Sequence, residues 1–447
     1  MNVAYLHGRH AGGKRSVAVI GSGISGASAA WALRDHANVT LFETEARPGG
    51  HTATVDIDYD GHRIAVDTGF IVYNGHNYPD LTDLLAHLGV ETHASNMGFS
   101  LSLDDGRMEW SGSTWASIFA QKRNLCSPSF LWMLREILRF NRQCVEDRDC
   151  GAIGHATIGE YLTARRFSAG FRDNYLIPMA AAIWSTPRVR MLDFPAVTFI
   201  DFFENHRLIH NERPEWRTVK GGARNYLDRL LAPLAGRVRL GCPVDALVRD
   251  AFGVTIWANG HAERFDDVVV AAHSDQALRL LSDATSVEQR ILSAIPYRPN
   301  RVVLHRDARL MPKRRAAWSA WNYLRRGEAG AEAEVCVTYW MNRLQGIDER
   351  FPLFVSLNPT VEPREDLVFG EWRFDHPQFD AQALAAQALL PDIQGMRNTY
   401  FAGAWTGYGF HEDGLRSGLD AAIALGAKVP WRAQPAYVPQ MLPLAAE

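Results

Sequence analysis

The chain has 447 residues, 47 of them basic and 50 acidic, and its formal charge of −3 argues against binding nucleic acid by phosphate neutralisation. A hydrophobic content of 47% is typical of a globular chain, and without a run of about 18 uncharged apolar residues we expect no transmembrane helix. Residues 1–15 lack the apolar core of a secretory signal, and five cysteines without a CxxC pair indicate reduced thiols and no metal site.

A dinucleotide-binding pattern opens the folded part of the chain. Residues 16–20 form a β-branched strand that leads into the GxGxxG of 21–26, followed by an alanine-rich helix from Ala27 to about Asp35 and a strand at 38–42. The glycines allow a tight turn, close approach of a pyrophosphate and tight packing of the helix, whose N-terminus offers free N–H groups. An acid after the second strand can bind a ribose. The predicted contacts are Gly21, Gly23, Ile24, Ser25, Gly26, Glu43 and Thr44.

A second glycine pair, Gly49-Gly50, follows the acid and would let the chain pass flat against another part of an extended ligand. A hairpin is expected around Asp60-Gly61. With these residues the sequence resembles the FAD-dependent amine oxidase superfamily, which includes phytoene-desaturase-like and protoporphyrinogen-oxidase-like enzymes. Many relatives carry arginine where this chain has His51. The resemblance implies further FAD contacts at Gly49, Gly50, His51, Thr68, Gly69 and Phe70.

The resemblance also implies the fold: α/β, with a Rossmann-like FAD-binding domain of the GR2, or amine-oxidase, type and an inserted α+β substrate domain. Residues 218–223 are similar to the segment that opens the return into the FAD domain. The strands at 242–248 and 265–272 follow in the family's order, and in relatives the backbone of the valine corresponding to Val244 contacts the adenine. Ala272 ends the second of these strands and is a further predicted contact.

Near the C-terminus a strand ends at Gly403-Ala404, and Gly414 to Gly426 is predicted as a helix. In the superfamily this helix directs its N-terminus at the flavin, where it stabilises the negative charge of the reduced ring. We therefore expect the N–H groups of Gly414 and Leu415 to be donors. Most relatives have aspartate at the position of Ala404.

Four residues before or at this helix are candidate catalytic residues. His411 and Glu412 would border the isoalloxazine, where either could act as acid or base or orient the substrate. The alternatives are that His411 satisfies a backbone turn and that Glu412 caps the helix. Trp405 and Tyr408 are candidates for the aromatic pair that often lines the flavin face in amine oxidases, or they serve packing. The active-site lysine of many amine oxidases has no assignable position.

The run from Gly407 to Gly418 more closely resembles the flavoprotein group fused to plant cyclopropane fatty acid synthases and its free-standing bacterial homologues. The resemblance implies a connection to modified fatty acyl chains. We therefore predict an FAD-dependent dehydrogenase or desaturase that removes a hydride from a lipid-like substrate. The alternatives are a flavin amine oxidase acting on a small amine or polyamine, and a non-catalytic flavoprotein partner of a lipid-modifying methyltransferase.

The order of these segments predicts a discontinuous FAD domain with substrate-domain segments inserted between its parts. We expect the FAD domain at 16–75, 215–285 and 395–428, the substrate domain at 76–214 and 286–394, an N-terminal tail at 1–15 and an extended, proline-rich C-terminal tail at 429–447.

Two segments bear on the place where the enzyme works. Residues 130–140 have apolar side chains at helical spacing and could border an acyl tunnel, lie on a bilayer or pack in the core. The basic runs 313–315 and 325–326 bracket Trp318, Trp321 and Tyr323, which would suit anionic headgroups, with a solvated charge run as the alternative. We expect a cytoplasmic protein, with attachment to the inner membrane face or to a lipid-modifying enzyme as further hypotheses.

Overall fold

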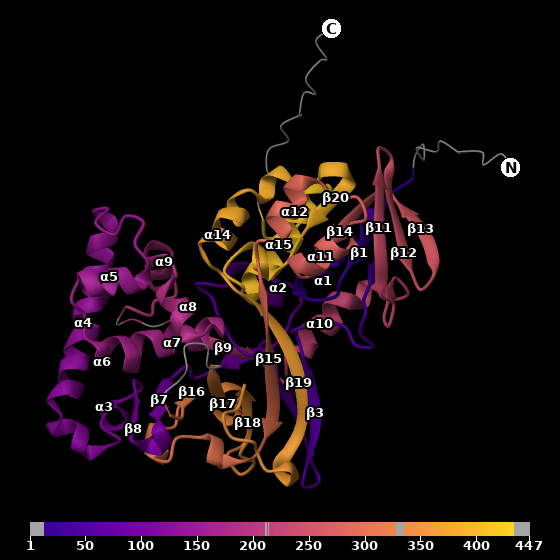
Figure 1. Ribbon diagram of the computed structural model, residues 1–447. Coiled ribbons are helices and arrows are strands. Elements are labelled where there is room, and N and C mark those ends of the chain that lie inside the picture. Colours follow the sequence, from indigo (N-terminus) through magenta and orange to yellow (C-terminus); the bar gives the residue numbers. More distant parts are fainter. Residues whose placement is uncertain (1–12, 211, 213, 328–334, 433–447) are drawn as a thin grey trace.

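The computed structural model describes residues 13–210, 212, 214–327 and 335–432. One half of the molecule contains a five-stranded parallel sheet (Figure 1). Its strands, in spatial order, are β10 (Val238–Arg239), β2 (Ala37–Phe42), β1 (Arg15–Ile20), β14 (Asp267–Val270) and β20 (Thr399–Phe401). The middle strands β1 and β14 are largely buried and β-branched, as a parallel sheet covered on both faces requires.

Helices α1 (Ile24–Leu33) and α15 (His411–Ala424) pack closely against each other in this half. A Cβ on Gly418 would lie 2.0 Å from the carbonyl oxygen of Ser25, so the two helix backbones approach where only glycine fits. Helices α2 (Pro79–His87) and α10 (Arg224–Leu231) belong to the same hydrophobic cluster. An antiparallel meander lies beside them, formed by β11 (Val244–Asp250), β12 (Gly253–Ala258) and β13 (His261–Phe265), and α11 (Ser274–Leu280) and α12 (Ser286–Leu292) follow.

The other half is built on a seven-stranded mixed sheet in which only β16 and β7 run parallel. In spatial order its strands are β19 (Val368–Pro377), β15 (Tyr297–His305), β18 (Phe354–Leu357), β17 (Cys336–Trp340), β16 (Trp321–Arg325), β7 (Phe99–Leu103) and β8 (Met108–Ser111). Its helices gather at the left of Figure 1: α3 (Trp115–Ile118), α4 (Pro128–Asp149), α5 (Ile158–Ala164), α6 (Ala169–Phe171), α7 (Ile177–Trp184), α8 (Arg188–Leu192) and α9 (Ala196–Asn205).

Short elements join the two halves. The hairpin β3 (Thr54–Tyr59) and β4 (His62–Asp67) turns at Asp60-Gly61, as predicted, and the Tyr59 ring lies 5.3 Å from that of Phe351 in the substrate half. A three-stranded sheet has the order β5 (Tyr73–Asn74), β9 (Trp216–Val219), β6 (Thr92–Ala94), and the remaining helices are α13 (Met341–Leu344) and α14 (Ala381–Ala388).

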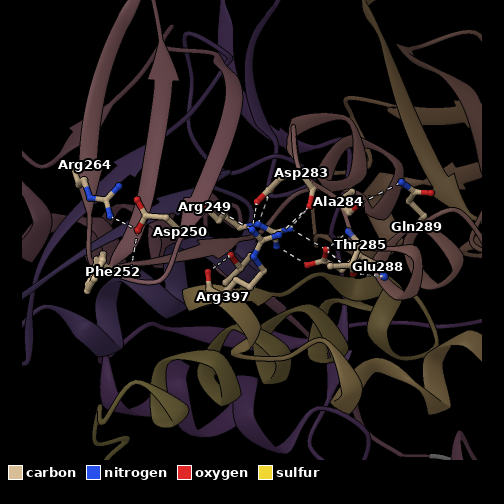
Figure 2. Close-up of polar contacts among 11 residues, drawn as sticks. Arg249, Asp250, Phe252, Arg264, Asp283, Ala284, Thr285, Glu288, Gln289 and Arg397 are labelled. Carbon is tan, nitrogen blue, oxygen red and sulfur yellow. Dashed lines mark hydrogen bonds and ion pairs between the residues drawn. The ribbon is translucent and has the colours of Figure 1, made fainter.

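A buried ion network ties the meander to α12 (Figure 2). The buried side chain of Arg249 donates two hydrogen bonds to Glu288, at 2.5 and 2.9 Å, and two to Asp283, to its carboxylate at 2.9 Å and to its carbonyl oxygen at 3.3 Å. Arg397 contacts the same Asp283 at 2.8 Å. Burial opposes the charge of Glu288, but the hydrogen bonds from Arg249 and Thr285, together with the charge of Arg249, outweigh it and hold the pKa of Glu288 below its ordinary value.

The structure corrects the predicted helix starts and the C-terminal tail. Helix α1 begins at Ile24 rather than Ala27, and α15 begins at His411 rather than Gly414. The predicted tail starts at 429, yet the Trp431 ring stacks 5.8 Å from the ring of Trp31. Residues 429–432 are therefore packed on the protein, while 1–12 and 433–447 lie outside the described residues.

All five cysteines are free thiols. Within the described ranges, no group of three His, Cys, Asp or Glu side chains is placed to hold a metal ion. In the same ranges, no helix has both the length and the apolar character needed to cross a bilayer.

Candidate active site

The glycine loop between β1 and α1 leaves an open approach to the helix. Gly21 has a φ of +97°, and a Cβ on Gly26 would lie 1.8 Å from the Gly21 carbonyl oxygen. A Cβ on Gly23, by contrast, would meet nothing within 4 Å. Gly23 thus borders open space where the predicted pyrophosphate would approach, and the other two glycines keep the loop tight.

The N-terminus of α1 carries donors without partners in the helix. The N–H of Ala27 donates to the Gly23 carbonyl oxygen at 2.9 Å, so the N–H groups of Ile24, Ser25 and Gly26 precede the first helical bond. No side chain caps them and no acid lies in the first turn. This donor set fits the phosphates of FAD.

The predicted ribose acid, Glu43, lies beside the strand predicted to contact the adenine. The carboxylate of Glu43 accepts the N–H of Ser22 at 2.9 Å and its hydroxyl at 2.5 Å, which fixes it beside the glycine loop. The carbonyl oxygen of Glu43 accepts the N–H of Cys242 at 2.8 Å, two residues before Val244 begins β11. Thr44 is exposed next to this junction. The predicted adenosine-binding residues therefore gather at one place.

The second glycine pair lies against the first glycine loop. Gly49 forms an isolated β-bridge with Gly23, and Gly49 and Gly50 have φ values of +110° and +54°. A Cβ on Gly50 would come within 3.5 Å of the Gly23 Cα. The chain at Gly49 and Gly50 can therefore pass close to the glycine loop 21–26, the predicted dinucleotide cradle.

The next predicted segment folds back on His51. A Cβ on Gly69 would lie 2.1 Å from the His51 carbonyl oxygen, and that oxygen accepts the N–H of Phe70 at 2.8 Å. Thr68 is buried and its hydroxyl donates to the carbonyl oxygen of Ala53 at 3.2 Å. These contacts hold the His51 backbone beside Phe70.

Trp405 does not line an open flavin face. The side chain is buried, and its Nε1–H donates to the carbonyl oxygen of Ala272 at 3.0 Å, which connects the ends of β20 and β14. The prediction of a catalytic Trp405 is therefore replaced by a packing and bridging contact. Beside it, Gly403 donates its N–H to the Ser417 hydroxyl at 2.9 Å, and Ala404 is half-buried.

The early start of α15 changes the expected donors. The N–H of Gly414 is 3.1 Å from the carbonyl oxygen of Phe410, so it closes the first helical turn, and Leu415 follows inside the helix. The free donors of this helix therefore lie one turn earlier than predicted, and a flavin contact of Gly414 and Leu415 stays a prediction. The groups ahead of the first helical bond are the N–H groups of His411, Glu412 and Asp413.

Glu412 caps another helix rather than its own. Its two carboxylate oxygens accept the N–H groups of Asp80, at 2.9 Å, and Leu81, at 3.0 Å, in the first turn of α2. Burial raises the pKa of Glu412 to about 7, although these two donors favour the carboxylate. Both oxygens are engaged in α2, which corrects the alternative that Glu412 caps its own helix, while its acid/base role stays a prediction.

His411 is an uncharged imidazole that two hydroxyl groups hold in place. Burial lowers the pKa of His411 to about 3. Its Nε2 lies 2.6 Å from the hydroxyl of the buried Tyr226, which lies 2.6 Å from the Thr52 hydroxyl. Donation from Thr52 to Tyr226 to His411 pairs both hydroxyl hydrogens, which assigns the imidazole hydrogen to Nδ1. The ring also stacks on Phe70, with centroids 3.8 Å apart.

Further histidines surround the predicted flavin-binding segment. The His51 ring lies 4.8 Å from Phe374 and 5.5 Å from His376, and both of these come from β19. Burial, together with the nearby His376, His273 and His411, lowers the pKa of His51 well below its ordinary value. Burial and His273 likewise lower the pKa of His376 to about 4. These rings are neutral near pH 7.

We expect this cluster to make the apoprotein sensitive to acid. Because the folded-state pKa values lie below the ordinary 6.5, the unfolded chain binds more protons below pH 6.5, and stability present above that pH is lost as the pH falls. His376→Gln should reduce the slope of the unfolding free energy against pH, below pH 6.5, by about 1.36 kcal/mol per pH unit. Urea midpoints between pH 5 and 8 measure this, with the exposed His261→Gln as control. Equal slopes for both variants would contradict the expectation.

Tyr408 belongs to an aromatic wall that links the loop before α15 to the helices of the substrate half. Its ring meets Phe202 of α9 edge-on at 5.7 Å, and Phe410 stacks on the same Phe202 at 5.3 Å. Trp184 of α7 and His206 lie 4.4 and 3.8 Å from Phe202 on its other sides. The region bordering α15 is therefore aromatic and weakly polar.

Sequence reasoning did not identify Tyr226 or His376 as part of the site. Tyr226 lies in the helix after the returning glycine segment, where no local pattern separates it from a core residue. His376 lies two residues after Phe374 on β19. Because side chains two residues apart on a strand point to the same face of the sheet, this spacing was the one sequence signal that His376 and Phe374 lie together.

The comparisons with known proteins agree with this geometry. Residues 19–88 match the family described as NAD(P)-binding Rossmann-like domain, and residues 153–346 match flavin containing amine oxidoreductase. A search of curated proteins gives no significant match.

Several solved structures share the fold over nearly their whole length. A double mutant of putrescine oxidase is 16% identical and has a TM-score of 0.66, with 93% of this chain and 99% of that chain covered. Cyclohexylamine oxidase from Brevibacterium oxydans IH-35A is 17% identical with a TM-score of 0.66, and the match covers 92% of this chain and 99% of that chain. A CLA-producing fatty acid isomerase from P. acnes is 15% identical with a TM-score of 0.63, and the match covers 92% of this chain and 98% of that chain. At such identities the likeness shows the fold, here an amine-oxidase fold.

The family match covers much of the substrate half, and the fold around it is that of an amine oxidase. The glycine cradle supplies the open space and the free donors that a flavin dinucleotide needs. The chain is therefore an FAD-dependent oxidoreductase with an amine-oxidase fold, and its residues 153–346 match the flavin containing amine oxidoreductase family.

Proposed function

We propose that this enzyme removes a hydride from a lipid-like, fatty acyl substrate, as a dehydrogenase or desaturase. The observation that carries the proposal is the neutral, aromatic character of the region around His411. The carboxylates there are engaged within the protein: Glu412 by α2, and Asp413 by the N–H groups of Tyr408 and Phe410, at 3.0 Å each. A cationic amine would need a free carboxylate to offset its desolvation, whereas an acyl chain would not.

The residues around the cofactor site have separate tasks in this proposal. When bound, FAD supplies the acceptor of the hydride. Tyr226 holds the neutral imidazole of His411, so that Nδ1 presents a hydrogen-bond donor to the reacting end of the substrate. Phe70, stacked on the imidazole, and Phe410 exclude water from the same region. The fatty acid isomerase among the similar structures supports a fatty acyl ligand in this fold.

Oxidation of a small amine or polyamine is the second candidate, because putrescine oxidase and cyclohexylamine oxidase share the fold. The position of the lysines weighs against it. All five lysines of the sequence are exposed, and Lys220 pairs with Glu91 at 2.8 Å on the surface. None of them is available for the lysine position of many amine oxidases.

An anaerobic visible spectrum of the holoenzyme separates the two candidates. One set of additions contains phospholipids with methyl-branched, cyclopropane or unsaturated chains, and the other contains primary amines and polyamines. Bleaching of the flavin bands by lipids alone supports the proposal, while bleaching by amines alone overturns it in favour of the second candidate. If neither set reduced the bound flavin, both candidate activities would be contradicted. That result would support the hypothesis of a non-catalytic flavoprotein partner of a lipid-modifying methyltransferase.

His411→Ala is expected to slow anaerobic flavin reduction by at least about tenfold with FAD still bound, because a positioned donor contributes to the reacting geometry. Glu412→Gln is the matched control, since its side chain contacts α2 rather than the aromatic region. Its reduction rate should stay within about twofold of the wild type. Stopped-flow absorbance measures both rates. Equal rates for the wild type and His411→Ala would remove His411 from the reaction.

A further inference from the structure

Exposed apolar side chains concentrate in one stretch of the substrate half. Of the eleven large hydrophobic side chains that are exposed in the described part of the chain, five lie between residues 115 and 138. Four of them are more than half exposed: Trp115 (78%), Leu125 (54%), Trp132 (52%) and Leu138 (69%). The fifth is Leu131. Such a concentration marks an interaction surface rather than scattered exposure.

Helix α4 has one buried face and one exposed face that mixes apolar and basic residues. At about 100° per residue, Phe130, Met133 and Phe140 fall on the buried side. The opposite side carries the exposed Leu131, Trp132, Arg135, Leu138 and Arg142. The guanidinium of Arg135 lies 5.5 Å from the centre of the Trp132 ring. The exposed face therefore offers rings and aliphatic chains beside cations.

A basic hollow lies next to the start of this helix. Lys122 and Arg123, in the 3₁₀ turn just before α4, line a surface depression of about 570 Å³ together with Arg314 and Arg315. No acidic residue lines it. The one carboxylate bonded to Arg314 is that of Glu109, which is fully buried beneath the surface. Four cations thus line the hollow, one of which, Arg315, lies 3.7 Å from the exposed carboxylate of Glu349.

The helix that contains residues 130–140 and the basic run at 313–315 therefore belong to neighbouring surfaces. The 3₁₀ turn that lines the hollow packs against α4, and the Phe119 ring meets the Phe130 ring at 6.0 Å. The guanidinium of Arg315 lies 3.9 Å from the centre of the Trp318 ring.

We infer that the exposed face of α4, the preceding turn and the basic hollow dock on an anionic phospholipid bilayer. Trp115, Trp132 and Leu138 would enter the boundary between headgroups and acyl chains, and the cations of the hollow would contact lipid phosphates. Charge complementarity selects this occupant: the protein as a whole has a charge of −3, yet its most apolar surface is bordered by cations. This membrane attachment does not depend on whether the substrate of the enzyme is a lipid or an amine.

Flotation of the holoenzyme with vesicles tests the docking surface. One set of vesicles contains phosphatidylcholine alone, and the other contains phosphatidylcholine mixed with phosphatidylglycerol. We expect at least about tenfold tighter binding to the anionic vesicles, with a loss of binding at high salt. Equal binding to both sets, or binding to neither, would overturn the inference.

Paired variants locate the contact on the protein. Trp132→Ser with Leu138→Ser, and separately Lys122→Glu with Arg123→Glu, should each weaken vesicle binding about tenfold or more. Phe252→Ser, which removes a 73% exposed ring from the distant meander, is the matched control and should bind as the wild type does. The flavin spectrum reports folding of each variant, and its reduction by soluble substrate is a separate readout of the proposed function. Light scattering that showed a dimer, broken by Trp132→Ser with Leu138→Ser, without vesicle binding would overturn the inference in favour of a second copy of the chain.

Discussion

Replacing Gly23 with alanine is expected to weaken FAD binding on the order of 100-fold while leaving the apoprotein as stable as the wild type. The added Cβ would meet nothing within 4 Å in the protein, and a φ of −58° suits any residue. The methyl group would instead occupy the space through which the phosphates approach the free N–H groups of α1. Titration of apoprotein with FAD, followed by flavin fluorescence, measures the affinity.

Gly26→Ala is the matched comparison, because the same methyl group would there lie 1.8 Å from the Gly21 carbonyl oxygen. The helix must move away from the loop, so we expect the apoprotein itself to lose roughly 1–3 kcal/mol of stability. Thermal unfolding without FAD separates the two variants. If Gly23→Ala bound FAD as tightly as the wild type, the assignment of the phosphates to this loop would be wrong.

Arg249→Met is expected to lower the free energy of unfolding by about 3–5 kcal/mol, because it leaves the buried Glu288 carboxylate without its partner. Removing both charges with Arg249→Met and Glu288→Leu should restore most of the loss, since a buried ion pair can be exchanged for apolar side chains at little cost. Asp283 keeps Arg397 as a partner in both variants. Urea unfolding of the apoprotein at pH 7 measures the difference.

The effect of Arg249→Met should also depend on pH. The pKa of Glu288 is held below its ordinary value in the folded protein, so the pair stabilises the fold above the unfolded-state pKa, near 4.5, and this contribution is lost as the pH falls through the folded-state pKa. The gap between wild type and Arg249→Met should therefore narrow in acid. A gap of constant size would show that the loss comes from packing rather than from charge.

Local patterns were sufficient for the dinucleotide cradle. The strand, the three glycines and the acid at Glu43 lie close together in sequence, and the tightest steric limit, between Gly26 and the Gly21 carbonyl oxygen, joins residues only five apart. The hairpin at Asp60-Gly61 was predictable for the same reason, because both residues adopt positive φ in its turn.

The chemistry near the flavin was less predictable because it depends on contacts between distant segments. Glu412 binds the N–H of Leu81, 331 residues away in sequence, and Tyr226 reaches His411 across 185 residues. The side chain of a residue beside a predicted active site can point toward the site or away from it. No local sequence pattern distinguishes a residue that caps a remote helix from one that acts as an acid or base. The early start of α15 likewise depends on Asp413, which accepts the N–H groups of Tyr408 and Phe410.

The discontinuous parallel sheet has a consequence for synthesis on the ribosome. Strand β1 emerges early, yet Ser16 bonds Asp266 across 250 residues, and β14 gains β20 only when residues 399–401 have been made. Until residues 267–270 have been made, β1 has one edge without its native neighbour, and β14 then has such an edge until β20 is made; edges of this kind favour aggregation. Complete translation therefore precedes closure of the FAD-binding sheet, and nascent chains that stall in the substrate half should depend on chaperones.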